Sequence, residues 1–428
     1  MNRKERRNLR KDKDLIKELY SIIIKYLPKL LDMFENLTDV RNQSYVTYKM
    51  KTICVTRLFG LLCGLTTMTD ISSDNFNSDN CIKNLSKICN QSLEDIPYWE
   101  TIQDVFMNIK TDELRDIQKY IVKALVRSKM FDKYRFNGYF QLLFDGTGLS
   151  NHDYNLNNNC LKRKHKDGKI SYYKYVLECK LVVGKIVISI DSEFIENSEI
   201  LNEKQKQDCE IKAFKRMVKR IKHNYPKYKF IITGDALYAA DTIIKICNKH
   251  EWKYIFNLKP DRLKEINESF EGNIVLLNEV NIPNYYLSTN IKYKEHNLNV
   301  FKYIETKNKK TTTFRYITNL SVNNENIEGI VAMGRRRWKI ENEGFYTQKH
   351  RTFNITHLNS RNDTAMKNHY FFIQFAHTIR QLLEQGNHLT KSLKLKIKEV
   401  SSFLLKTLTS TNSDLNNLET NFQLRFDN

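Results

Sequence analysis

The chain has 428 residues, of which 41% are hydrophobic, so it can build a packed core and is not a wholly disordered protein. Lysine and arginine number 70 against 49 aspartates and glutamates, which gives a formal net charge of +21. This excess favours a polyanionic partner such as nucleic acid, although a generally basic, highly soluble protein would share it.

Cysteine usage and hydropathy indicate the compartment. The eight cysteines form no C-x-x-C pair, which predicts reduced thiols and neither a disulfide framework nor a zinc site. The first residues are too polar for a signal peptide, and the longest apolar runs are too short to span a bilayer. We therefore expect a cytoplasmic, nucleoid-associated bacterial protein with no membrane contact.

The first third of the chain has a helical pattern. Residues 1–13 form a basic arm, and residues 14–135 repeat apolar side chains at spacings of three and four, as at Leu15, Leu19 and Ile22. We expect a helical N-terminal domain that either reads DNA or caps the core; the pattern leaves both open.

From residue 136 to 260 the period changes to that of a sheet. The predicted order is β-β-β-α-β-α-β, with elements at residues 140–144, 172–182, 185–190, 203–223, 229–233, 241–250 and 254–258. Residues 261–334 are β-rich after one short helix. Helices are then predicted over 335–349, 363–385 and 390–408, so that 335–386 completes the core and 387–428 forms a helical tail.

Two aspartates follow apolar strands and precede turn residues. Asp145 ends the run Phe140–Phe144, and Asp235 comes directly after Phe230–Gly234. Each alone fits a turn or a helix cap. Together they indicate a ligand site, because strand ends at one edge of an α/β sheet are where ligands bind.

A third cluster occurs on the predicted helix 335–349. It combines basic, aromatic and acidic residues, namely Arg335, Arg336, Arg337, Trp338, Glu341, Glu343 and Lys349. Arg337 and Glu341 share one face at a spacing of four, which a plain surface salt bridge would also explain. Glu343 points away from Glu341 on a regular helix, so only one of them can join the aspartates.

Further basic residues are candidates for DNA contact. Lys162, Arg163 and Lys164 follow Asp145 and either track a DNA backbone or belong to a solvated loop. Trp338 either stacks on a base or packs in the core.

These motifs resemble the DDE-type transposases of bacterial insertion sequences. The resemblance covers most of the chain and rests on Leu143-Phe144-Asp145-Gly146-Thr147, Ser192-Glu193-Phe194-Ile195-Glu196-Asn197, Lys206-Gln207-Asp208-Cys209-Glu210, Gly234-Asp235-Ala236-Leu237-Tyr238-Ala239 and Arg337-Trp338-Lys339-Ile340-Glu341-Asn342. It implies an α/β fold with an RNase H-like core, a mixed five-stranded sheet with flanking helices, and a β-rich insertion at residues 261–334.

The resemblance also implies a site and a reaction. Asp145, Asp235 and Glu341 would be the catalytic triad and would hold two Mg²⁺ or Mn²⁺ ions. The substrate would be double-stranded DNA, both the terminal inverted repeats and the target, with a homodimer on the paired ends. A nuclease or resolvase on the same core, or a DNA-binding protein that no longer cuts, remains an alternative.

The chain departs from the related subgroup at two positions. That subgroup's helix reads Tyr-x2-Arg-x3-Glu-x6-Lys, whereas here Gly334 takes the tyrosine position and Gln348 the lysine position, with Lys349 next to it. The departure leaves the acids in place and leaves open whether cleavage passes through a DNA hairpin.

Overall fold

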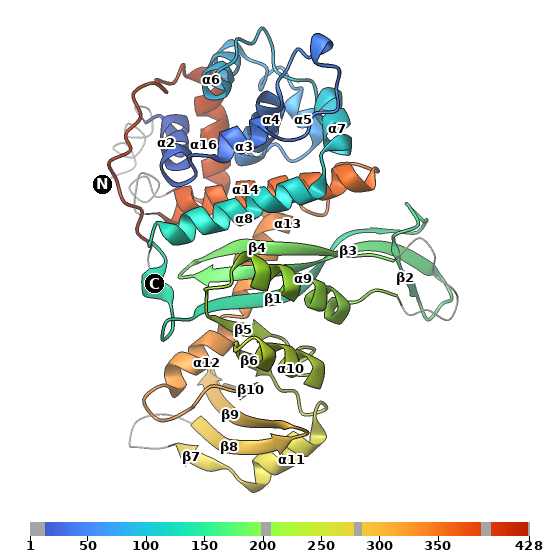
Figure 1. Cartoon of the computed structure of the whole chain (residues 1–428), viewed down its shortest axis with the longest axis vertical. Coiled ribbons are helices and arrows are strands. Elements are labelled where there is room, and N and C mark those ends of the chain that lie inside the picture. Colours follow the sequence, from blue (N-terminus) through green and yellow to red (C-terminus); the bar gives the residue numbers. More distant parts are fainter. Residues whose placement is uncertain (1–12, 198–206, 278–284, 387–394, 427–428) are drawn as a thin grey trace.

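The computed structural model describes residues 13–197, 207–277, 285–386 and 395–426. A helical part, a central mixed sheet and a set of inserted strands follow one another along the long axis of the molecule (Figure 1). The predicted fold class, an α/β protein with an RNase H-like core, is confirmed. Most of the basic arm and the beginnings of the predicted helices 203–223 and 390–408 lie outside the described residues.

The N-terminal region is helical, as the periodicity predicts. Its helices are α2 (Leu15–Tyr26), α3 (Leu30–Glu35), α4 (Met50–Leu62), α5 (Met68–Ile71), α6 (Asp79–Cys89), α7 (Trp99–Asn108) and α8 (Thr111–Arg127). The first begins where Asp14 accepts hydrogen bonds from the backbone of Ile16 and Lys17, which are otherwise unpaired at a helix start. No helix in the described part of the chain is both long and apolar enough to cross a membrane.

The sheet contains ten strands within the described residues. They are β1 (Phe140–His152), β2 (Leu161–Lys164), β3 (Ile170–Val183), β4 (Ile186–Ile195), β5 (Phe230–Gly234), β6 (Lys253–Asn257), β7 (Val275–Leu277), β8 (Tyr285–Tyr293), β9 (His296–Lys307) and β10 (Lys310–Thr318). The five core strands lie in the order β4-β3-β1-β5-β6. β1, β5 and β6 pair in parallel, and β3 pairs antiparallel with both of its neighbours, β1 and β4.

The inserted strands extend this same sheet. β10 pairs antiparallel with β6, with Tyr316 opposite Asn257, and β9, β8 and β7 follow in turn. This arrangement covers the outer edge of β6, which would otherwise expose unpaired backbone groups. A short helix, α11 (Lys264–Gly272), packs against β8.

Helices cover both faces of the sheet (Figure 1). α9 (Glu210–Asn224) packs on β4 and β3, and α10 (Asp241–Lys249) and α12 (Ile327–Arg335) pack on β6. α14 (Asp363–Gln385) lies between the sheet and the N-terminal helices, and contacts β4, α4, α7 and α8. α16 (Ile397–Ser410) packs on α6 and α2, so the end of the chain belongs to the helical part.

Strand β1 is longer than the sequence predicts. The strand runs through Asp145, Gly146 and Gly148 to His152, so Asp145 lies inside the strand and the expected turn after it is wrong. The physical reason is the pairing with β3, whose residues remain opposite those of β1 as far as His152. Cross-strand hydrogen bonds outweigh the weak turn preference of the two glycines.

The predicted single helix over residues 335–349 is also wrong. α12 ends at Arg335, a turn follows, and a π-helix, η3 (Ile340–Tyr346), leads into the short helix α13 (Thr347–His350). The wider π turn changes the direction in which its side chains point, and such turns recur at functional sites.

The basic segment after Asp145 is not a loop. Lys162, Arg163 and Lys164 lie on strand β2, which pairs with the first residues of β3, and all three side chains are exposed. Lys162 and Arg163 lie over the rings of Tyr172 and Tyr173.

Candidate active site

The register of two parallel strands brings Asp145 and Asp235 to neighbouring positions. Leu143 of β1 is paired with Thr233 of β5, and each aspartate comes two residues later, Asp145 within β1 and Asp235 directly after the end of β5. Because side chains alternate between the faces of a sheet, two residues beyond a matched pair point to the same face. The sheet itself therefore places the two carboxylates side by side.

The backbone around Asp235 is tightly packed. Its carboxylate accepts a hydrogen bond of 2.8 Å from the backbone of Leu237, which closes the turn after β5. A Cβ added at Gly234 would lie 2.6 Å from the buried ring of Tyr238. Glycine is therefore required before Asp235, because the ring occupies the space of a side chain.

The π-helix brings a glutamate to the same place. Arg337 Nη1 lies 2.8 Å from Glu341 Oε1 and 3.7 Å from Asp145 Oδ2, so one buried guanidinium joins the two acids. The expectation that Arg337 and Glu341 share one face at a spacing of four is confirmed, and the two form the salt bridge that was the plain alternative. Arg337 Nε is buried and has no hydrogen-bond partner among the described residues.

Glu343 has other neighbours. Its charge acts to raise the pKa of Lys339, which burial lowers, and its Oε2 is buried without a hydrogen-bond partner in the described residues. Of the two glutamates that the sequence left open, Glu341 is the one that forms ion-pair contacts beside Asp145.

A fourth carboxylate, Glu210, lies in this cluster and was not predicted as a site residue. It is the first residue of α9 and accepts a hydrogen bond of 3.2 Å from Tyr175 Oη. A Cβ at Gly146 would lie 2.7 Å from Glu210 Oε1 and 2.4 Å from the ring of Tyr175. The sequence holds two signals for it: the glycine after Asp145, which allows this close approach, and the motif Lys206-Gln207-Asp208-Cys209-Glu210, which ends at this residue.

The four acids repel one another. Burial raises the pKa of Asp145 to about 7, and Glu210, Glu341 and Asp235 add to the shift, whereas Arg337 opposes it. Burial and the charge of Asp235 also raise the pKa of Glu210. Partly buried acids that raise each other's pKa are a recognised mark of functional sites.

Lys349 is the second cation near the cluster. Burial lowers the pKa of its amine, and the charge of Asp145 acts in the opposite direction. Gln348, at the position where the related subgroup has lysine, is fully buried and donates to Gln374 Oε1 at 2.8 Å. Gln348 therefore lies in the protein interior. The positive charge that the subgroup has at this position is carried here by the next residue, Lys349.

Gly334, at the subgroup's tyrosine position, has no room for a side chain. A Cβ there would lie 2.7 Å from the ring of Tyr316. Tyr316 is a buried residue of β10, so a strand of the insertion fills the space beside Arg335 and Arg337.

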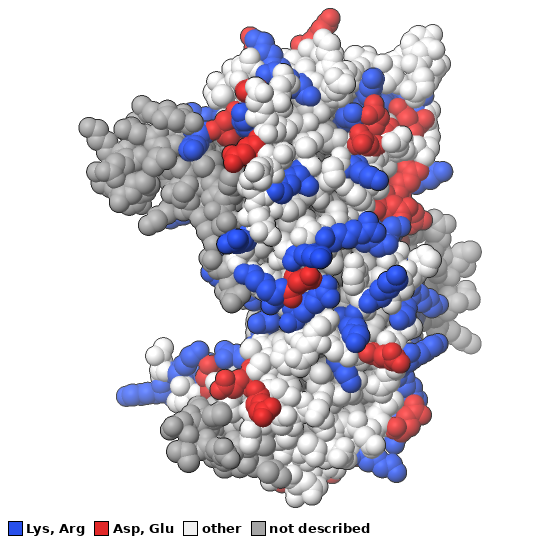
Figure 2. Space-filling model, turned by 60° about the vertical axis from the view of Figure 1, so that its left-hand side comes forward, with Lys and Arg blue, Asp and Glu red and all other residues white. Residues whose placement is uncertain are grey.

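The other predicted DNA-contacting residues lie in different environments. Trp338 is 51% exposed and lies against Arg337, so the alternative that it packs in the core is wrong. Arg335 forms an ion pair of 2.9 Å with Glu305, whereas Arg336 has an exposed side chain. Figure 2 shows lysine and arginine gathered across the middle of one face, with few acids among them.

A different acidic group, which includes none of these four acids, is compact enough to hold a metal ion. Among the described residues, only Asp241, Glu295 and His296 place one ligand atom each within 4.8 Å of the others. Lys245 and Lys294 already lie 3.2 and 3.4 Å from Asp241 Oδ2. These ammonium groups balance the charge, so the group is a salt-bridge network between α10 and the β8–β9 turn.

Comparison with known families agrees with the geometry. The family described as "Transposase DDE domain" matches residues 142–379, and "DDE_Tnp_1-associated" matches residues 31–120. The first match covers more than half of the chain and includes all four acids, so the protein belongs to the DDE transposase family. Transposases of this family act on DNA and use a divalent metal ion. No curated protein was found to match the chain.

Proposed function

We propose that the protein cleaves DNA strands at the ends of an insertion sequence and joins the freed ends to target DNA. The observation that carries this proposal is the cluster of Asp145, Asp235 and Glu341 on neighbouring strands and the π-helix. The basic surface supplies the attraction for DNA.

The donor set fits a hard divalent cation. Among the described residues, Arg337 and Lys349 are cations that act on Asp145, and its pKa is nevertheless raised, by burial first and then by the neighbouring acids. Carboxylate oxygens are the ligands that Mg²⁺ and Mn²⁺ prefer. We assign Asp145, Asp235 and Glu341 as the residues that would hold two such ions. When bound, the ions would activate the attacking oxygen and stabilise the leaving oxygen.

The chain's own groups position the DNA. Arg337 holds Glu341 beside Asp145, and we assign its guanidinium to a neighbouring phosphate oxygen. Exposed Trp338 offers a ring face for an unpaired base. Pairing two element ends implies at least a homodimer, in which each subunit would act on one end.

The test is cleavage and joining of a labelled duplex that carries the element's inverted repeats, with Mg²⁺, Mn²⁺ or EDTA. Native protein is expected to nick and join only with metal. Asp145→Asn and Glu341→Gln are expected to abolish both activities and to retain DNA binding. Glu343→Gln is the matched control, because Glu343 lies two residues from Glu341 but has different neighbours.

Each other outcome selects a different function. Loss of cleavage only in Glu343→Gln would make Glu343, and not Glu341, the third metal-binding acid. Nicking without joining would indicate a nuclease or resolvase, and tight binding without cleavage would indicate a DNA-binding protein that does not cut.

A further inference from the structure

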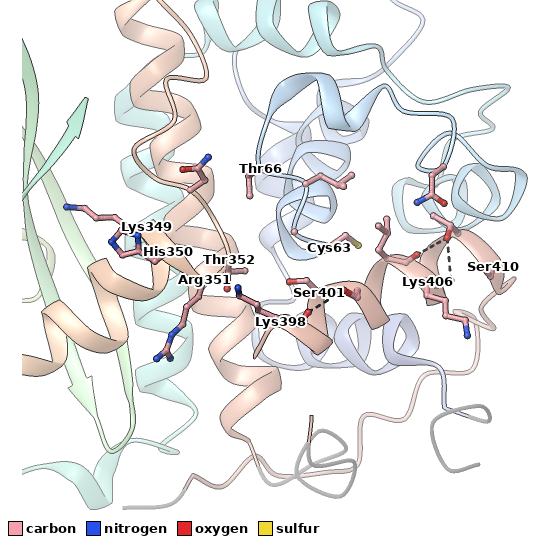
Figure 3. Close-up of a pocket in the computed structure, with 17 residues that line it drawn as sticks. Cys63, Thr66, Lys349, His350, Arg351, Thr352, Lys398, Ser401, Lys406 and Ser410 are labelled. Carbon is pink, nitrogen blue, oxygen red and sulfur yellow. Dashed lines mark hydrogen bonds between the residues drawn. The ribbon is translucent and has the colours of Figure 1, made fainter. Parts of the chain in front are cut away.

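A basic cavity of about 670 Å³ lies next to the candidate active site. Figure 3 shows the segment from Lys349 to Thr352 on one side and α16 on the other, with Cys63 and Thr66 between them. The two walls come from residues far apart in the sequence, the end of α13 and the C-terminal helix.

The lining of the cavity has one sign of charge. Five basic side chains contribute to it, Lys349, His350, Arg351, Lys398 and Lys406, and no acid occurs among the described residues that line it. Serine and threonine residues of α16 lie on the same wall; the hydroxyls of Ser402 and Thr409 donate to carbonyls of their own helix. Cations interleaved with hydroxyls are the groups that bind phosphate and sugar oxygens of nucleic acids.

The α16 wall is held rigidly. Buried Arg380 of α14 donates to Ser401 Oγ at 3.0 Å, to the carbonyl of Ile397 at 2.8 Å and to the carbonyl of Leu62 at 2.7 Å. A Cβ at Gly64 would lie 2.9 Å from Ser401 Cβ, so the turn after α4 packs directly on this helix. The cavity is therefore formed before any ligand arrives, which reduces the entropic cost of binding.

Lys349 connects the cavity with the acids. It lines the cavity, and it lies on α13, which continues directly from the π-helix that carries Glu341. In Figure 3 its side chain extends away from α16. A strand that passes from the acids over Lys349 would enter the cavity within a few nucleotides.

We infer that this cavity binds the sugar–phosphate backbone of one DNA strand immediately beside the scissile phosphate. The inference rests on the proposed function for the position of the scissile phosphate, but the binding itself needs neither metal nor cleavage. The volume is in the range of sites for small ligands, about 300–1,000 Å³, which suits a short piece of one strand better than a duplex.

The first experiment measures DNA affinity against salt concentration in EDTA, for native protein and for Lys398→Gln combined with Lys406→Gln. Both side chains are exposed, so the fold should tolerate the change. We expect at least tenfold weaker binding and a salt slope lower by about 0.9 for each phosphate that the variant no longer neutralises. The matched control is Lys292→Gln with Lys310→Gln, two exposed lysines of the inserted strands.

Equal losses of affinity in the two double variants would overturn the inference, because only total charge would then matter. Unchanged binding in the α16 variant would also overturn it. Cleavage by native protein would still support the proposed function in either case. Conversely, cavity-dependent binding by a protein that never cuts would retain the inference and reject the proposed function.

A second experiment locates the strand. Ser402→Cys on the α16 wall, in a Cys209→Ser background that removes the one exposed native cysteine, is mixed with duplexes that carry a tethered mixed disulfide at single phosphates, so that thiol–disulfide exchange releases a small thiol. We expect disulfide formation only at phosphates within a few nucleotides of the cleavage site, and none with exposed Ser44→Cys. Uniform crosslinking along the duplex, or none, would overturn the inference.

Discussion

The sheet carries two groups of charged residues that differ in how their charges are balanced. Between β3, β4 and α14, Glu178 and Lys180 are fully buried and lie 3.2 Å apart. Glu178 also accepts hydrogen bonds from Ser189 and Tyr370, and Lys180 donates to Gln374 at 2.8 Å. In this interior network each of the two charges has an opposite charge and hydrogen-bond partners.

The acids beside β1 and β5 have no such balance. Asp145, Asp235, Glu210 and Glu341 act on one another through like charge, with Arg337 as their closest cation. Stability alone would favour a balanced arrangement like that of Glu178 and Lys180. Like charge that is not compensated is typical of ligand sites, and it distinguishes these four acids from the interior network.

The largest expected effect is on catalysis. Asp235→Asn should lower strand cleavage by about 10³-fold or more, since metal coordination supplies several kcal/mol of transition-state stabilisation. Thermal stability without metal should stay equal or rise, because a like charge is removed. Cleavage rates and melting curves test both, with Asp241→Asn as the matched control. Retained cleavage would place Asp235 outside the metal site.

The interior network should respond in stability instead. Lys180→Met leaves Glu178 buried without its cation and should lower the free energy of unfolding by about 3–5 kcal/mol. Chemical denaturation measures the loss, and Glu178→Gln with Lys180→Met should recover much of it. A loss below about 1 kcal/mol in the Lys180→Met variant would contradict the description of Glu178 and Lys180 as a pair in which each charge balances the other.

Two buried histidines predict a smaller, pH-dependent effect. Burial lowers the pKa of His369 and His377 well below its usual range. As the pH falls below about 6.5, the unfolded chain gains protons that the folded chain does not. Stability should therefore fall by up to about 1.4 kcal/mol per histidine for each pH unit.

The measurement is unfolding in EDTA between pH 7.5 and 5.5, a range of about two units around the ordinary histidine pKa. His377→Gln should flatten the curve, and exposed His165→Gln should leave it unchanged. The raised pKa of Asp145 acts in the opposite direction over this range, so the comparison of variants carries the test. A His377→Gln curve that is parallel to that of the native protein would mean that this ring accepts protons in the folded state.

The smallest expected effect concerns Glu210. Glu210→Gln removes one of the charges that raise the pKa of Asp145, so that pKa should fall below about 7. Carboxyl NMR of metal-free protein follows it, with exposed Glu265→Gln as control. An unchanged Asp145 pKa would separate Glu210 from the acidic cluster.

Much of the fold could be predicted from local pattern. The strands at Phe230–Gly234 and Lys253–Asn257 and the helix Asp363–Gln385 lie where their apolar periodicity predicts. The hairpin between β3 and β4 turns at Gly184, which has a φ of +55°. These elements follow from residue spacing and turn chemistry, both of which operate over a few neighbours.

The prediction failed where distant partners decide the local structure. Gly146 and Gly148 lie in a strand because β3 pairs with them, and the helix after Arg335 becomes a π-helix around Glu341. Glu210 reaches the acids only because α9 begins beside Tyr175. None of these interactions has a counterpart in the neighbouring sequence.

By itself, the sequence determined the class of fold and the basic charge. It also pointed to three acids, whose role as a catalytic set remains a prediction. Only the tertiary structure decided that Asp145 and Asp235 share a register, that Glu341 and not Glu343 has ion-pair contacts there, and that a basic cavity adjoins them. The reason is physical. Periodicity and propensity act along the chain, whereas strand pairing, burial and the repulsion between charges depend on residues that folding brings together.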